Sequence, residues 1–134
     1  MHDPNVAGTG PGTPSSSLRI LEHAKAALEA LDVDAIVALY ADDAELRDAS
    51  TGESFRGSER IRRMFLELFS APGAEFAHVS VREGPAWGVI EWTWSSKTKG
   101  SDKPLRIRGV SVLELAENKV VRETFYYDPR SSSR

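Results

Sequence analysis

The sequence predicts an α+β fold in which three helices come first and a run of antiparallel strands follows. Up to about residue 70, apolar residues recur every three to four positions, as in helices that bury one stripe. From about residue 75 to 128 the pattern changes to alternation interrupted by short turn segments, as in a β-meander. Helices that are segregated from an antiparallel sheet in this way usually cover one of its faces.

The predicted domain lies between two polar ends. Residues 1–17 are rich in proline, glycine and serine and carry little apolar bulk, so we expect a disordered tail. Residues 18–128 form the predicted domain, and residues 129–134 a flexible C-terminus. The N-terminus lacks a basic region followed by an apolar one, and no apolar run reaches the ~20 residues that span a bilayer. We therefore expect a cytoplasmic protein without a membrane partner.

Two consecutive helices are predicted at the start of the domain. The first apolar stripe consists of Leu21, Ala24, Leu28 and Leu31. The second stripe, after a break at Asp32, consists of Val33, Ile36, Val37 and Tyr40. Both follow the helical period, so Tyr40 is expected to close the second helix.

A short strand, 44–48, follows the second helix. Its alternation places two charged residues on one face and Ala44, Leu46 and Asp48 on the other. Two interpretations of Asp48 remain open. Its carboxylate could line a cavity beneath the helices, where burial would raise its pKa toward a value useful to a general base. It could instead cap the backbone N–H groups of the turn ASTG that follows.

The third helix is predicted to begin with Ser58 as its N-cap and to stop at Pro72. Its stripe consists of Ile61, Met64, Phe65, Leu68 and Phe69. Four strands are expected at about 75–83, 86–98, 104–116 and 119–128. The second and third of these strands are apolar on both faces near their centres. Because helices cover only one face of the sheet, we expect a homodimer to cover the other.

Composition excludes several classes of function. The 17 Lys and Arg residues against 20 Asp and Glu give a formal net charge of −3 with the two signs interspersed, which disfavours nucleic acid as a partner. The absence of cysteine removes thiolate nucleophiles and cysteine-type zinc sites. The three histidines have no metal-ligand spacing, and no phosphate loop or dinucleotide fingerprint is present. We expect neither a metal nor a cofactor.

The element order and three segments resemble the nuclear transport factor 2-like superfamily, in its SnoaL-like branch of polyketide cyclase and ketosteroid isomerase relatives. The segments are YADDAELRD, FRGSERIRRMF and RGVSVLELAENKVVRETFYYDP. The resemblance implies a cone-shaped fold in which a curved antiparallel sheet packs against the three N-terminal helices. That fold hosts isomerases, cyclases, hydrolases and proteins without catalysis, so it leaves the function open.

The resemblance also implies candidate site residues. The general-base aspartate of ketosteroid isomerase corresponds to Asp48 here. Ser111 and Phe65 stand where that enzyme has an aspartic acid and a tyrosine, and the first helix lacks its tyrosine, so classical ketosteroid isomerase activity is not expected. Limonene epoxide hydrolase has an aspartate after an aromatic pair at the end of its last strand, as Asp128 follows FYY here. The alternative for Asp128 is a solvated or arginine-paired carboxylate.

The candidate site therefore has Asp48 and Asp128 as acid–base groups. The expected pocket residues are Tyr40, Phe65, Trp92, Trp94, Ser111 and Tyr126. We predict a cofactor-independent isomerase, cyclase or hydrolase acting on a small apolar molecule. The alternative is a non-catalytic small-molecule-binding or dimerisation module. An enzyme needs a carboxylate and a donor group together in a closed apolar cavity, whereas a binding module needs only the cavity.

Overall fold

The computed structural model describes residues 16–97 and 104–128. The helices are α2 (Ser16–Ala30), α3 (Val33–Val37) and α4 (Ser58–Ser70). The strands are β1 (Tyr40–Asp48), β2 (Ser54–Arg56), β3 (Glu75–Gly84), β4 (Trp87–Lys97), β5 (Pro104–Ala116) and β6 (Lys119–Tyr127). Helix α2 begins two residues before the expected domain start, and the rest of both expected tails lies outside the described residues. Within the described ranges, no helix combines the length and the apolar character needed to cross a membrane.

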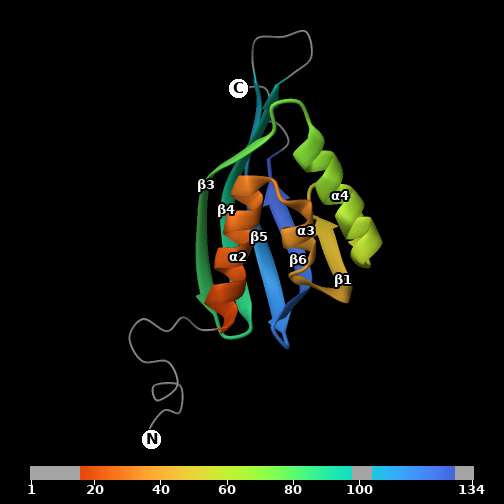
Figure 1. The fold of residues 1–134 in the computed structure, drawn as a ribbon, viewed down its shortest axis with the longest axis vertical. Coiled ribbons are helices and arrows are strands. Elements are labelled where there is room, and N and C mark those ends of the chain that lie inside the picture. Colours follow the sequence, from red (N-terminus) through yellow and green to blue (C-terminus); the bar gives the residue numbers. More distant parts are fainter. Residues whose placement is uncertain (1–15, 98–103, 129–134) are drawn as a thin grey trace, which may run out of the picture.

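The predicted α+β architecture is confirmed, with one correction to the sheet. Its six strands run in the order β2-β1-β6-β5-β4-β3, and all neighbours are antiparallel except β1 and β6, which are parallel. The sheet is therefore mixed rather than antiparallel, because β6 returns to pair between β1 and β5 (Figure 1). The strand β2 is not predicted from the sequence, since three residues are too few to display a period of two.

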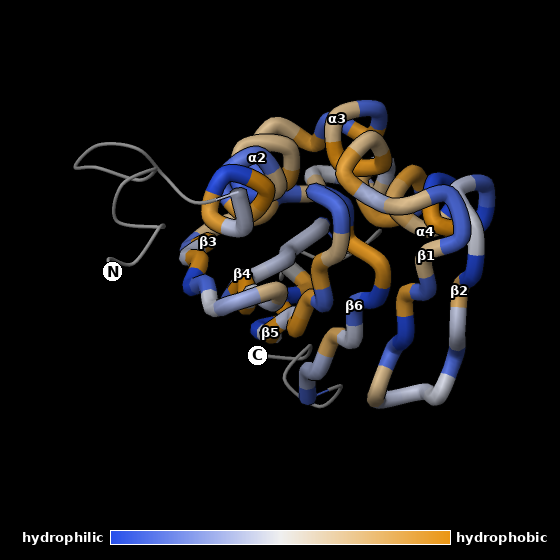
Figure 2. Tube along the Cα trace, turned by 90° about the horizontal axis from the view of Figure 1, so that it is seen from below, coloured by the Kyte–Doolittle hydropathy of each residue, from blue (hydrophilic) through white to orange (hydrophobic). Residues whose placement is uncertain are grey.

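The three helices cover one face of the curved sheet (Figure 2). The core between these layers is built from the apolar stripes that the sequence predicts. Its largest fully buried side chains are Leu21, Leu46, Ile61, Leu113 and Val120. Helix α4 is capped by Gly57 at φ 93°, one residue before the expected Ser58, and the Gly57 N–H donates to the carbonyl of Ala44 on β1.

Tyr40 starts a strand instead of ending a helix. Helix α3 stops at Val37, and the Leu39 carbonyl accepts a hydrogen bond of 2.8 Å from the Val120 N–H of β6. Hydrogen bonding to β6 places the chain in the sheet at this point. A helical period in the local sequence gives no information about such a long-range contact. Between Tyr40 and Glu45 the register against β6 shifts; Tyr40, Ala44 and Leu46 are buried, whereas Asp42, which shares their parity, is exposed within the shifted segment.

Two more irregularities decide which side chains point inward. In β3, His78 adopts a positive φ of 54° in a bulge, so that Phe76 and Val79 are both buried despite their odd spacing. In β6, Val120 pairs with Leu115 whereas Arg122 pairs with Glu114, which leaves Val121 as the extra residue. The bulge switches the inward parity of β6 before the strand reaches the site described next.

Candidate functional site

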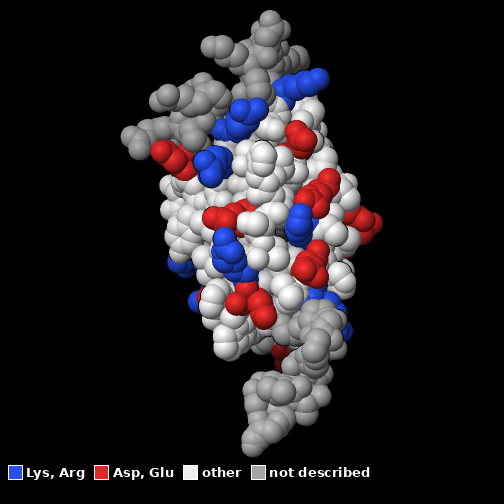
Figure 3. Space-filling view, turned by 90° about the vertical axis from the view of Figure 1, so that its left-hand side faces the viewer, with Lys and Arg blue, Asp and Glu red and all other residues white. Residues whose placement is uncertain are grey.

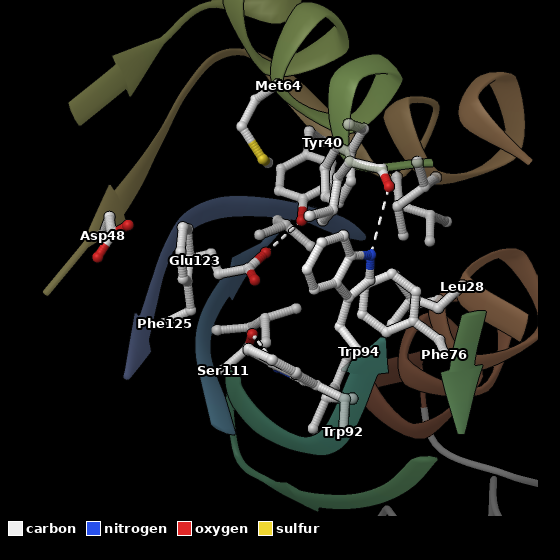
Figure 4. Close-up of a pocket in the computed structure, with 18 of the residues that line it drawn as sticks. Leu28, Tyr40, Asp48, Met64, Phe76, Trp92, Trp94, Ser111, Glu123 and Phe125 are labelled. Carbon is white, nitrogen blue, oxygen red and sulfur yellow. Dashed lines mark hydrogen bonds between the residues drawn. The ribbon is translucent and has the colours of Figure 1, made fainter. Parts of the chain in front are cut away.

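A cavity of ≈ 190 Å³ lies between the helices and the inner face of the sheet. Its walls come from all three helices and from strands β1, β3, β4, β5 and β6. Most of the lining residues are apolar, and Met64, Leu28 and Phe76 are among those visible in Figure 4. For scale, a dry engineered cavity of about 150 Å³ binds benzene, so this one suits a molecule of about one substituted six-membered ring.

Four polar side chains form a hydrogen-bonded chain across the cavity wall. The Tyr40 hydroxyl donates to Glu123 Oε1, and Glu123 is also hydrogen-bonded to the Ser111 side chain. Trp92 Nε1 donates to Ser111 Oγ at 3.0 Å (Figure 4). One residue comes from each of the neighbouring strands β1, β6, β5 and β4, so sheet pairing brings the chain together.

The order of donors and acceptors directs two hydroxyl groups at one carboxyl group. Because Ser111 Oγ accepts from Trp92, its own single proton is available for Glu123. Tyr40 supplies the second donor, so both hydroxyls stabilise the ionised form of Glu123. No buried side-chain nitrogen or oxygen in the described residues lacks a hydrogen-bond partner, and this chain is part of the reason.

Burial opposes that stabilisation and outweighs it. Removal from water raises the pKa of Glu123 above its ordinary value, while the hydrogen bonds from Tyr40 and Ser111 lower it by less. Burial also raises the pKa of Tyr40 well above its ordinary value, with a further contribution from the nearby Glu123 charge. Glu123 therefore exchanges its proton closer to neutral pH than a solvated glutamate, and Tyr40 remains a hydrogen-bond donor.

Asp48 caps the turn and also borders the cavity. Its Oδ1 accepts from the backbone N–H groups of Ser50 at 2.9 Å and Thr51 at 3.2 Å, as the capping interpretation expects. Its Oδ2 accepts from the Tyr127 hydroxyl at 2.8 Å. Burial, followed by the hydrogen bond to Asp48, raises the pKa of Tyr127 to about 12. In Figure 4 the Asp48 carboxylate lies apart from the Tyr40–Glu123 pair.

The other residues that the sequence predicts for the site lie on two different faces of the sheet. The cavity is lined by Tyr40, Phe65, Trp92, Trp94 and Ser111. Tyr126 and Asp128 instead border a broad depression on the outer face of the sheet, where Tyr126 is 48% exposed and Asp128 is exposed. Strand β6 alternates at this point, so Phe125 and Tyr127 face the cavity side whereas Tyr126 faces away.

Sequence reasoning missed Glu123, because the bulge at Val121 hides its direction. Counting in twos from the buried Val120 places Glu123 on the outside. The available signal is the parity that Glu123 shares with Phe125 and Tyr127 further along the same strand. No group of three or more histidine or acidic side chains in the described residues is arranged to hold a metal ion.

Comparisons with known proteins agree with this architecture. A family model for the SnoaL-like domain matches residues 21–123. Among curated proteins none matches the chain. The resemblance to the SnoaL-like branch of the nuclear transport factor 2-like superfamily, expected from the sequence, is thus confirmed.

Solved structures share the fold at low sequence identity. A protein with a ketosteroid isomerase-like fold from Catenulispora acidiphila, in complex with trimethylamine, is 18% identical with a TM-score of 0.74, covering 87% of this chain and 90% of its own. An epoxide hydrolase of M. tuberculosis, described as LEH-like, is 18% identical with a TM-score of 0.71, covering 88% and 86%. An NTF-2 like protein of unknown function from Burkholderia xenovorans is 24% identical with a TM-score of 0.68, covering 84% and 83%.

Proposed function

Because the chain belongs to the SnoaL-like domain family, we propose that it binds a small molecule in its cavity and moves a proton on it through Glu123. The observation that carries the proposal is a buried carboxyl group and a hydroxyl donor, Glu123 and Tyr40, side by side in an apolar cavity. This is the combination that separates an acid–base enzyme from a simple binding pocket.

Glu123 suits the role of proton acceptor better than the two aspartates. A general base works best when its pKa lies near the working pH, and burial moves the pKa of Glu123 in that direction. The oxygens of Asp48 already accept three hydrogen bonds, from the turn and from Tyr127. Asp128 borders the outer depression and not the cavity. We therefore assign Asp48 to positioning the end of β1 and leave Asp128 outside the reaction.

The proposed step is a proton shift within one molecule. Glu123 removes a proton from a carbon next to a carbonyl group, and the C–H electron pair moves into the dienolate or enolate that forms. The Tyr40 hydroxyl, which lies beside Glu123, donates to the developing oxyanion. The protonated Glu123 then returns its proton to another carbon of the same intermediate, so the reaction needs no cofactor.

The size of the cavity limits the substrate. A steroid or a four-ring polyketide greatly exceeds ≈ 190 Å³, whereas a single substituted ring fits. The trimethylamine bound by the Catenulispora relative is a small molecule of the kind that such a cavity admits. We propose small, largely apolar carbonyl compounds as substrates.

Isomerisation of cyclohex-3-en-1-one tests this proposal, because its conversion to the conjugated ketone is followed directly by absorbance. We expect Glu123→Gln to lower the rate by about 10²-fold, since the amide cannot accept the proton. The matched control is Glu114→Gln, which makes the same change on the outer side of β5 and should retain full activity. Full activity in Glu123→Gln would refute the assignment.

The non-catalytic alternative draws on one specific observation. Both hydroxyl donors near Glu123 are already hydrogen-bonded to it, so a ligand oxygen must compete for them. Saturable binding of cyclohex-3-en-1-one without any isomerisation by the wild-type protein would favour a binding module over an enzyme.

We also propose that the outer face of the sheet forms a homodimer. Val110 on β5 pairs in register with Tyr126 on β6, and Val112 and Tyr126 are both large apolar side chains left exposed on that face. Light scattering at about 100 μM should give the mass of a dimer, because interfaces of standard size bind more tightly than that. Tyr126→Ala should shift the mass toward the monomer. A monomeric wild-type protein at that concentration would exclude the dimer.

A further inference from the structure

The cavity combines an aromatic wall with negative charge. Seven of its twenty lining residues are aromatic, among them Trp92, Trp94 and Phe125. Two of the lining residues, Asp48 and Glu123, carry carboxyl groups, and none of the described lining residues is a lysine, arginine or histidine. An anion entering this cavity would meet like charge without a compensating cation. A cation would meet the Glu123 carboxyl group and the negative faces of aromatic rings.

We propose that the ligand of this cavity is a small organic cation, a substituted ammonium whose apolar groups lie against the aromatic wall and whose charge lies near Glu123. This inference deepens the proposed function and rests on it, because it concerns the same cavity and the same carboxyl group. It replaces the expectation of a purely apolar molecule with one that is apolar in surface and positive in charge.

The geometry favours an ammonium over other cations. A bare metal ion needs several oxygen ligands in one place, and the described residues supply no cluster of three or more acidic or histidine side chains. A guanidinium carries five N–H donors that require planar acceptors, whereas most of this wall is hydrocarbon. An ammonium substituted with methyl groups has few or no N–H groups to satisfy and presents mostly carbon to the wall.

A positive ligand would also set the protonation state of Glu123. Tyr40 is hydrogen-bonded to Glu123, and the other titratable groups that line the same cavity are Asp48 on β1 and Tyr127 on β6; no basic side chain is among the described residues that line it. A bound cation therefore becomes the main positive charge in the cavity and favours the ionised form of Glu123. The ligand itself would keep the proposed base ready to accept a proton. Binding should accordingly strengthen as the pH rises through the titration of Glu123.

Choline and 3,3-dimethylbutan-1-ol provide a matched pair of probes, because the alcohol replaces the ammonium nitrogen of choline by carbon and keeps the shape. Isothermal titration calorimetry on the full chain at pH 8 would compare them. We expect choline to bind at least about tenfold more tightly than the alcohol, a difference of about 1.4 kcal/mol. Glu123→Gln should weaken choline by about tenfold and leave the alcohol within about threefold, whereas Glu114→Gln should change neither.

The outcomes separate the two proposals. Equal or tighter binding of the alcohol by the wild-type protein would overturn the cation proposal and leave a neutral ligand for the proposed function. Failure of both probes to bind at millimolar concentration would overturn the cation proposal and also count against a cavity open to molecules of this size. Unchanged choline affinity in folded Glu123→Gln would show that its carboxylate is not the counter-charge. The wild-type comparison of the two probes stands even if that variant fails to fold.

Discussion

Glu45 and Glu123 occupy neighbouring strands but belong to opposite faces of the sheet. In the parallel pairing of β1 and β6, Glu45 lies opposite Arg122 and the next residue, Leu46, lies opposite Glu123. A hydrogen bond from Ser54, assisted by nearby arginines, lowers the pKa of Glu45. Burial raises the pKa of Glu123. The face on which each side chain lies therefore decides its chemistry, since the two residues are of one type and hold nearly the same place on neighbouring strands.

Figure 3 shows acidic and basic side chains interspersed over one flank of the molecule. Charges of this kind have water and partners of opposite sign within reach, as Glu45 does with Arg56 and Arg122. Among the described residues that line the cavity, Glu123 meets hydroxyl groups and hydrocarbon but no lysine, arginine or histidine. Three predictions test this contrast.

The largest difference in stability is expected between substitutions of two adjacent residues on β5, Leu113 and Val112. Leu113 is 1% exposed and pairs with Glu123, whereas Val112 is 38% exposed on the outer face. Leu113→Ala should lower the free energy of unfolding by about 3 kcal/mol in urea titration, because it removes a buried side chain and leaves a void. Val112→Ala should change it by less than about 0.5 kcal/mol in the monomer. Equal losses of unfolding free energy in Leu113→Ala and Val112→Ala would contradict the predicted difference between the inner and outer faces of the sheet.

A smaller loss is expected from Gly109→Ala, also on β5. A Cβ atom there would lie 2.4 Å from the Trp92 ring and 2.8 Å from the backbone oxygen of Tyr126. The ring can turn away but the backbone resists, so we expect a loss of about 1–3 kcal/mol from overpacking. Because Trp92 would leave Ser111, tryptophan emission should change as well. If Gly109→Ala kept the stability and the tryptophan emission of the wild type, the prediction would be wrong, because the cavity wall would then accommodate a side chain at this position.

The smallest effect is a difference in the pH dependence of stability. Glu123 has a raised pKa in the folded protein, so its stabilising contribution is complete below its ordinary pKa and is lost as the pH rises through the raised value. Glu123→Gln should therefore reduce the fall in stability between mildly acidic and neutral pH, measured by urea unfolding at each pH. Glu45→Gln is the matched comparison: its lowered pKa adds stability above the ordinary pKa that is lost on acidification. If Glu123→Gln kept the wild-type slope, Glu123 would not be the titrating group.

The fold was largely predictable because local periodicity carries it. The helical stripes gave α2 and α4, and alternation with turn residues gave β3 to β6 within one or two residues. The errors arose where distant pairing overrides a local pattern. Tyr40 continues a helical stripe in sequence, yet hydrogen bonds to β6 place it in β1. The parallel pairing of β1 with β6 has no local signal either.

The candidate site was less predictable, because it depends on register across four strands. Trp92 and Trp94 were nominated from their residue type, and both line the cavity. The Asp48 carboxylate caps the turn and also borders the cavity, two positions that the sequence could not tell apart. Glu123 was hidden by a single extra residue, Val121, that reverses the parity of β6. A one-residue irregularity of this kind moves every later side chain to the other face.

The place of β6 between β1 and β5 has a consequence for how the protein is made. Of the described strands, β6 is synthesised last, yet it pairs on both sides. Until it emerges from the ribosome, β1 and β5 each present an open edge to which another chain can add. Joining β1 to β6 also closes a long loop that contains β2, α4, β3, β4 and β5, and such distant pairings form slowly. Glu123 lies on β6, so its carboxyl group becomes buried in the same late step of folding that completes the sheet.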